Sequence, residues 1–179
     1  TNRGGLIRCI NGRAYKQTGL LKNGKYKVLR VGNFFTNSSW YYSDLELEED
    51  KYCTNGDLLY AWSASFGPKI WKGEKTIFHY HIWNVKYEDI LYRDYLYYYL
   101  EYDKKTILDS TTGSTMIHIA MEHMNPRFIA IPPLAEQHRI VAAIEKWFAV
   151  IDQLEKNEAD LKKSIEQTKK KVLDLALRG

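Results

Sequence analysis

Apolar residues recur at alternating steps of three and four positions along the last quarter of the chain, residues 134–179. This stretch has no proline and no glycine before its final residue, so nothing in it interrupts a helix. Such spacing produces a heptad seam along one side of the helix. We expect this coiled-coil interface to consist of Ile140, Ile144, Trp147, Ile151, Leu154, Glu158, Leu161, Ile165, Thr168, Val172 and Leu175.

A helix of this length spans roughly 65 Å at about 1.5 Å per residue. That is farther than the diameter of a domain of about 130 residues, so most of the seam needs another helix as its partner. The pattern predicts two domains, a globular head over residues 1–133 and a coiled-coil helix over residues 134–179.

Short runs with a period of two, separated by turn residues, dominate the head and predict a sheet-rich domain. Residues 26–31 alternate, residues 58–62 are apolar, and Gly67 and Pro68 are expected to close that second element. Residues 76–85 form a β-branched and aromatic run. We expect a last strand at residues 127–131.

One helix is expected inside the head, over residues 90–102, where apolar residues lie on more than one face. A polar loop is expected to follow at residues 109–114. The predicted fold class is therefore α+β, with a β-rich head followed by a long C-terminal helix that pairs in a coiled coil.

Composition fits a soluble globular protein, with 45% hydrophobic and 27% charged residues in 179. The sequence contains no apolar run of 18 or more residues and no signal-peptide pattern at its start, so we expect a cytoplasmic location and no membrane partner. Cys9 and Cys53 are expected to be separate reduced thiols.

Charge is distributed unevenly along the chain. No acidic residue precedes Asp44, whereas this segment carries eight basic residues: Arg3, Arg8, Arg13, Lys16, Lys22, Lys25, Lys27 and Arg30. A polyanion is the natural partner of such a segment. A solvated basic face with its counter-charges nearby in the fold is the alternative, and the charge pattern alone leaves both open.

Basic residues are interleaved with aromatic and amide residues in the predicted loops. Phosphates need cations and base edges need donors and acceptors, and both kinds occur here. Carbohydrate binding or simple burial of the rings would fit the same composition. The candidate DNA-binding residues are Arg13, Tyr15, Lys16, Arg30, Asn33, Lys69, Trp71, Lys72, Ser110, Thr112, Ser114 and Thr115.

Motifs of catalysis are absent from the sequence: no phosphate-binding loop, dinucleotide fingerprint, nucleophile elbow, zinc-protease or calcium-loop pattern occurs. Residues 125–128 (NPRF) resemble the Asn-Pro-Pro-aromatic motif of amino-methyltransferases, but an arginine replaces the second proline and no cofactor loop precedes it. His79 and His81 could supply two metal ligands, yet no third stands at suitable spacing. We expect no catalytic or metal site.

Residues 131–155 (IPPLAEQHRIVAAIEKWFAVIDQLE) resemble the conserved region that closes each target-recognition domain in specificity subunits of type I restriction-modification systems. The likeness rests on the Pro-Pro-Leu that precedes the helix, an acidic-Gln-basic-Ile-Val start and an Ile-Asp pair further along. Three head segments resemble the recognition domain of the same family: residues 10–16, 29–35 and 55–67.

The resemblance implies a non-catalytic component that reads double-stranded DNA. A complete subunit of the family resembles two head-plus-helix units whose helices pack antiparallel, so that two heads read the halves of a split site. This chain has one such unit, and its partner helix would come from the same subunit or from a second copy. The resemblance also implies modification subunits that bring S-adenosylmethionine and a restriction subunit that uses ATP and magnesium, with no cofactor in this chain.

The seam length is comparable with two turns of B-DNA, roughly 70 Å, so an antiparallel pair could hold two heads across one site. Glu158 occupies a central seam position, where a polar residue can fix register through a basic partner such as Lys162. A solvated kink is the alternative. Two other functions stay open: a coiled-coil adaptor whose head binds protein or carbohydrate, and a methyltransferase, which the missing cofactor motif disfavours.

Overall fold

The computed structural model describes residues 5–63, 65–110 and 130–178. The chain divides into two compact units, Thr1–Gln137 and His138–Gly179. The first unit holds two four-stranded sheets and helix α2, and the second is formed by most of helix α4 (Leu134–Arg178). The predicted combination of a β-rich head and a long C-terminal helix is confirmed.

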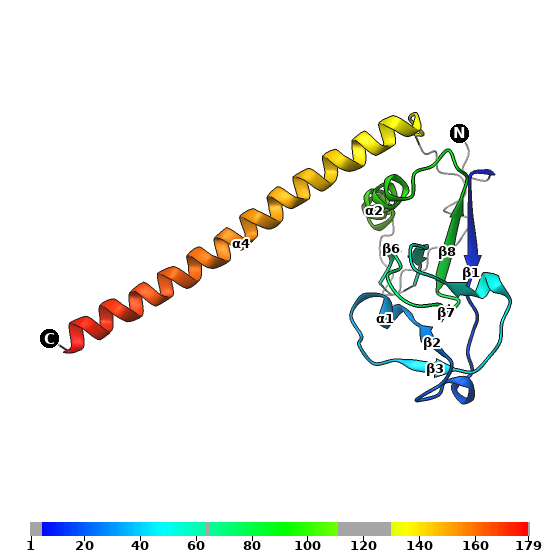
Figure 1. The fold of residues 1–179 in the computed structure, drawn as a ribbon, viewed down its shortest axis with the longest axis horizontal. Coiled ribbons are helices and arrows are strands. Elements are labelled where there is room, and N and C mark those ends of the chain that lie inside the picture. The colour runs from blue at the N-terminus through cyan, green and yellow to red at the C-terminus, as the bar shows by residue number, and fades with distance from the viewer. Residues whose placement is uncertain (1–4, 64, 111–129, 179) are drawn as a thin grey trace. The chain divides into compact units, whose positions relative to one another are not determined.

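The first sheet has the strand order β1 (Ile7–Asn11), β8 (Ile82–Tyr87), β5 (Leu58–Ala61) and β6 (Gly67–Ile70), and all its neighbours are antiparallel. Figure 1 shows β1 and β8 side by side. Because β5 lies in the interior of this sheet, all four of its residues are buried.

The second sheet has the order β3 (Tyr41–Ser43), β2 (Tyr26–Leu29), β7 (Thr76–Phe78) and β4 (Tyr52–Cys53). Its central pair, β2 and β7, is parallel, and the outer pairs are antiparallel. The short helix α1 (Val31–Phe35) follows β2 directly. Two 3-10 turns, Gln17–Gly19 and Glu49–Lys51, complete the connections.

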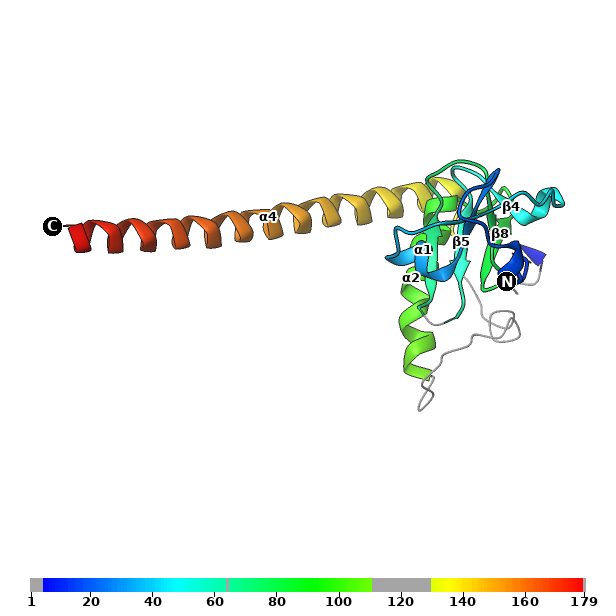
Figure 2. The ribbon, with the colours of Figure 1, turned by 90° about the horizontal axis from the view of Figure 1, so that it is seen from below.

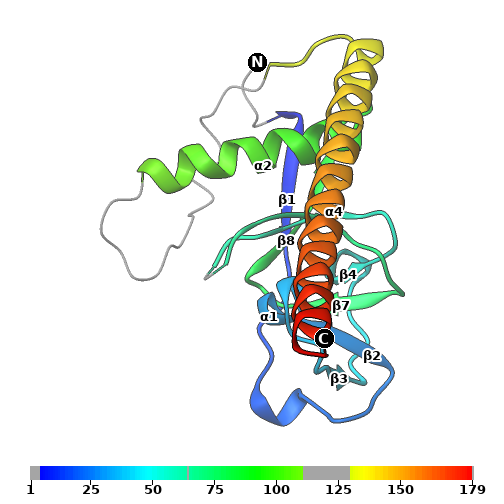
Figure 3. The same cartoon turned by 90° about the vertical axis from the view of Figure 1, so that its left-hand side faces the viewer.

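Alternation along β5 divides the head core into two layers. Leu58 and Tyr60 pack with the apolar residues of α2 (Arg93–Ser110), which crosses the first sheet in Figure 3. Leu59 and Ala61 point to the opposite face, where they pack with residues of β2, α1, β7 and β8. This follows from the two-residue period of a strand, which sends successive side chains to opposite faces.

Two sequence predictions need correction. The helix expected at residues 90–102 begins later and continues to Ser110, past the start of the loop predicted at residues 109–114. No proline or glycine lies between Arg93 and Ser110, so nothing ends the helix earlier. Gly67 and Pro68 are the first residues of β6 rather than a closing turn, since β6 is at the edge of its sheet, where proline is tolerated.

The run predicted at residues 76–85 is interrupted. It forms two strands that belong to different sheets, β7 in the second sheet and β8 in the first. A turn at residues 79–81 connects them. Residues 127–129 of the last expected strand lie outside the described part of the chain, and Ala130 and Ile131 are irregular.

Helix α4 runs for 45 residues without a break, as predicted from Leu134 onward, and Figure 2 shows it as one continuous coil. Its first turn is closed by the Pro133 carbonyl, which accepts hydrogen bonds from the backbone N–H groups of Glu136 and Gln137. No helix described in the structure is long and apolar enough to cross a membrane. Cys9 and Cys53 are free thiols, as expected.

Candidate functional site

The turn at residues 79–81 is the point where the chain passes from the second sheet to the first. The His79 N–H donates to the carbonyl of Leu29 at 2.9 Å, and the His79 carbonyl accepts from the N–H of Ile82 at 2.9 Å. The first of these bonds holds the turn against the end of β2, and the second closes the turn itself. Residues that are distant in sequence therefore meet around His79.

The segment after β1 lies against the same turn. The Arg13 N–H donates to the Phe78 carbonyl at 3.0 Å, and the Arg13 carbonyl accepts from the Tyr80 N–H at 3.1 Å. Gly12 makes this approach possible, because a Cβ there would lie 2.2 Å from the Phe78 carbonyl oxygen. Arg13 is thereby placed, with an exposed side chain, beside the turn.

Tyr15 extends this contact. Its ring centroid is 6.3 Å from that of His79, and its hydroxyl lies 3.5 Å from the Phe78 carbonyl. Burial raises the pKa of the Tyr15 hydroxyl well above its usual range, with the Arg13 charge opposing the shift. Tyr15 is consequently a neutral donor that supports the turn, and its ring is half-buried.

Arg30 follows β2 and is the N-cap residue of α1. Its backbone is extended, with φ −112° and ψ 163°, and its side chain does not cap the helix. The guanidinium carbon lies 5.4 Å from the centroid of the Tyr41 ring, within cation–π range. No ion pair joins Arg30 to another described residue, so its planar donors remain available.

Asn33 holds the loop that follows α1. Its Nδ2 donates to the carbonyl of Ser39 at 2.6 Å and to that of Asn37 at 3.2 Å. The Ser39 N–H in turn donates to Oδ1 of Asn37 at 2.8 Å. The amide of Asn33 therefore fixes the loop with its nitrogen, and its oxygen accepts from no residue in the described part of the chain.

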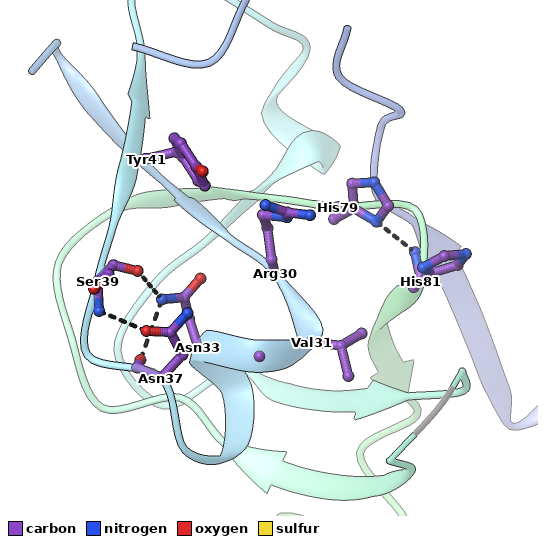
Figure 4. Close-up of a pocket in the computed structure, with 9 residues that line it drawn as sticks. Arg30, Val31, Asn33, Asn37, Ser39, Tyr41, His79 and His81 are labelled. Carbon is purple, nitrogen blue, oxygen red and sulfur yellow. Dashed lines mark hydrogen bonds between the residues drawn. The ribbon is translucent and has the colours of Figure 1, made fainter. Parts of the chain in front are cut away.

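These elements enclose a pocket of about 290 Å³. Figure 4 shows Arg30 between Asn33 on one side and His79 on the other, with Tyr41 on the same side as Asn33. Its lining residues come from the N-cap of α1, α1 itself, the loop after it, β3 and the turn at 79–81. They are Arg30, Val31, Gly32, Asn33, Asn37, Ser39, Tyr41, His79 and His81.

The pocket lining includes no acidic residue and carries the positive charge of Arg30. Burial, with the neighbouring His81 and the positive Arg30, lowers the pKa of His79 to about 4. His79 is therefore neutral at pH 7. Its Nδ1 accepts a weak hydrogen bond, 3.5 Å long, from the His81 N–H, which leaves the proton of the neutral ring on Nε2.

Among the predicted DNA-binding residues, the structure brings Arg13, Tyr15, Arg30 and Asn33 together around His79. Lys16 and Lys72 are exposed but do not line the pocket. Thr112, Ser114 and Thr115 and the side chain of Ser110 lie outside what the structure describes.

Two predicted residues have structural roles instead. Trp71 is 9% exposed and packs in the core with Phe78 and Ile82, and its indole N–H donates to the Glu74 carbonyl at 3.1 Å. Little of the Trp71 side chain is left open to a ligand, and the DNA contact predicted for this residue stays a prediction. Lys69 donates through Nζ to the carbonyl of Phe34 at 2.5 Å, which engages its charge at the end of α1.

Sequence reasoning missed the remaining polar residues of the pocket. Asn37, Ser39 and Tyr41 are not among the predicted binding residues, yet all three line the pocket. The turn that brings His79 and His81 to Arg30 depends on the parallel pairing of β2 with β7, which joins segments about 50 residues apart. Among the described residues no group of three or more potential metal ligands occurs.

The helix α4 presents a second feature, its apolar seam. Trp147, Ile151, Leu154, Leu161, Ile165, Val172 and Leu175 are all exposed, with Trp147 at 68% and Leu175 at 75%. Oε1 of Glu158 lies 2.6 Å from Nζ of Lys162 on the same helix, and both side chains are exposed. Such a long apolar stripe in water is costly without a partner.

Comparisons with known proteins agree on one family. Residues 3–167 match the model of the type I restriction modification DNA specificity domain. A putative type I restriction enzyme specificity subunit of Haemophilus influenzae is 28% identical over 164 residues, covering 85% of this chain and 41% of that protein. The EcoBI specificity subunit of Escherichia coli is 22% identical over 144 residues, covering 80% of this chain and 30% of that protein.

Solved structures show the same fold. A chain from a study of assembly and conformational transition of the type I R-M system aligns with a TM-score of 0.77 and 20% identity, over 97% of this chain and 44% of that one. The HsdS subunit of Thermoanaerobacter tengcongensis aligns with a TM-score of 0.69 and 20% identity, over 86% of this chain and 38% of that subunit. The chain thus spans less than half the length of each of these proteins.

Proposed function

The chain belongs to the type I restriction modification DNA specificity domain family, and from this we propose that its head reads one half of a bipartite target in double-stranded DNA. The observation that carries the proposal is the pocket around His79. An available arginine and an available amide oxygen lie there beside the exposed Arg13, and no acidic residue lines it. A protein that recognises a DNA sequence needs cations to contact the phosphates, and hydrogen-bond donors and acceptors to contact the base edges.

The helix is proposed to be the spacer between two such heads. Its partner is the second helix of a complete subunit or another copy of this chain. For two antiparallel copies, the seam aligns Ile144 with Leu175 and Val172 with Trp147, and it sets Glu158 opposite Leu161, next to Lys162 of the other copy. Each seam position from Ile144 to Leu175 faces another seam position in this register, with Thr168 opposite Ile151, so the seam is compatible with antiparallel pairing.

Catalysis is assigned to other subunits. We propose that modification subunits bind the paired helices and bring S-adenosylmethionine, and that a restriction subunit brings ATP and magnesium. The lack of a catalytic motif in the sequence supports a recognition role for this chain. The adaptor alternative has no support from the relatives, which are described as specificity subunits.

Salt dependence of duplex binding tests the DNA-binding role. The full chain is incubated with a random-sequence duplex library, bound duplexes are sequenced, and affinity for the selected duplex is measured over a range of salt. We expect one short motif, and an affinity that falls linearly on a log–log plot as salt rises.

A matched pair of charge removals locates the binding face. Arg13→Ala should weaken all duplexes evenly and reduce the salt slope by about 1, as for a lost phosphate contact. Lys163→Ala removes the same charge from an exposed position of α4 outside the seam and should leave binding unchanged. Binding without sequence preference and with equal sensitivity to both changes would contradict the proposal.

A further inference from the structure

The pocket around His79 has a fixed pattern of donors and acceptors. We propose that it reads a guanine–cytosine base pair in the major groove, with Arg30 donating to guanine and Oδ1 of Asn33 accepting from the cytosine amino group. This inference rests on the proposed DNA-binding function and names the base pair that the site selects.

The orientation of Asn33 is determined by its neighbours. Both partners of its Nδ2 are carbonyl oxygens, of Asn37 and Ser39, which accept and cannot donate. The amide nitrogen must therefore face the loop, and the oxygen is left on the side of Arg30, as Figure 4 shows. Asn33 cannot pair with adenine through both amide groups, because its donor is already engaged. It offers an acceptor alone.

Arg30 offers only donors. Its guanidinium is planar, permanently charged and held over the ring of Tyr41 at 5.4 Å. A guanidinium fixed in this way matches O6 and N7 of guanine with two parallel hydrogen bonds, the commonest specific contact of arginine with DNA. Arg30 and Asn33 line the same pocket, so both can reach one base pair.

The order of the groups distinguishes the base pairs. Across the major groove a G·C pair presents two acceptors on guanine and then the donor on cytosine, whereas an A·T pair presents its donor between two acceptors. In Figure 4 the donor Arg30 lies between the acceptor of Asn33 and His79. His79 adds no acceptor on the other side of Arg30, because its Nδ1 already accepts from the His81 N–H and its Nε2 carries the proton. The acceptor therefore stands at one end of the row, which matches G·C.

A phosphate is a poorer fit to this pocket. Phosphate oxygens only accept hydrogen bonds. The amide oxygen of Asn33 is also an acceptor, so it would face a phosphate oxygen with no hydrogen bond between them. A base pair that carries both kinds of group satisfies Arg30 and Asn33 together.

The first test repeats the duplex selection with Arg30→Ala. The native chain should select a motif with a fixed G·C pair, and the variant should lose the preference at that one position, by about five- to 150-fold, while retaining the rest. Arg30 is exposed and caps nothing with its side chain, so the variant should fold. Lys22→Ala removes the same charge from an exposed position outside the pocket lining and should leave every motif position unchanged.

The second test changes the DNA. Replacing the selected guanine by 7-deazaguanine removes N7 alone, and it should weaken the native chain several-fold while leaving Arg30→Ala unaffected. The inference would be overturned if Arg30→Ala lost its preference at an A·T pair, or if it weakened binding to all sequences by the same factor. It would also be overturned if 7-deazaguanine weakened binding of the native chain and of Arg30→Ala equally. In those cases a selected motif still supports DNA reading by the head, whereas a native chain that selects no motif contradicts the proposed function itself.

Discussion

Gln137 shows how a single residue of the helix start is tied to the head. Its side chain is fully buried, Oε1 accepts from the Tyr92 N–H at 2.7 Å, and Nε2 donates to the carbonyls of Ile90 at 2.7 Å and Pro132 at 2.9 Å. All three partners are backbone groups of loops that precede helices. The glutamine of the family-like motif therefore closes the junction between α2 and α4 from within the first unit.

Replacing Gln137 with alanine should lower the free energy of unfolding of the head by roughly 1–3 kcal/mol, since buried backbone groups would lose their partners. Urea unfolding followed by tryptophan fluorescence measures this change. Gln153→Ala is the matched control, because Gln153 is exposed and bonds only to Asn157 on the same helix among described residues. Equal effects of the two substitutions would contradict the role assigned to Gln137.

His79 makes stability depend on pH. Its pKa is about 4 in the folded chain and 6.5 as the ordinary value, so between these values the unfolded chain binds a proton that the folded chain does not. Stability should therefore fall as pH drops through this window, by less than about 1.4 kcal/mol per pH unit. Burial against Tyr15, the neighbouring His81 and the charge of Arg30 oppose protonation of His79.

His79→Gln keeps a polar side chain and removes the titration. Urea midpoints at pH 7 and pH 5 should differ less for this variant than for the native chain. An unchanged difference would mean that another group causes the loss of stability in acid.

At the scale of the element, α4 has one polar position at the centre of its seam. Replacing Glu158 with isoleucine should make the helix pair more stable and reduce its preference for one register and orientation, because a continuous apolar seam tolerates alternatives. Sedimentation reports the oligomer and site-specific crosslinking reports the orientation. If both stay as in the native chain, the exposed Glu158–Lys162 pair has no role in register and is only an interaction within one helix.

The strands of the head illustrate a limit of periodicity. Residues 76–85 read as a single β run, and the structure splits it at residues 79–81 between two sheets. Local propensity is the same on both sides of the turn, so nothing in the run itself marks the crossing. The His79 turn is held instead by Leu29 and Arg13, which are distant in sequence.

At the scale of the whole molecule, the helix length should set the distance between the two half-sites. Inserting a copy of residues 151–157 after residue 157 adds one heptad, about 10 Å, which corresponds to about 3 bp at about 3.4 Å each. The spacer between half-sites in selected duplexes should lengthen by that amount. The same seven residues placed after Arg178 lie beyond the seam and should leave the spacer unchanged. An equal effect of both insertions would contradict the proposal that the length of the helix sets the distance between half-sites.

The sequence alone determined the long helix, its seam, the β-rich class of the head and the family, because these depend on periodicity and on a contiguous motif. It also indicated Arg13, Arg30 and Asn33 as binding residues by their chemistry. Only the tertiary structure decided that Trp71 is buried, that the donor of Asn33 is engaged by its own loop, and that His79 joins Arg30 in one pocket. The meeting of His79 with Arg30 follows from the pairing of β2 with β7, a contact between distant segments that no local pattern encodes.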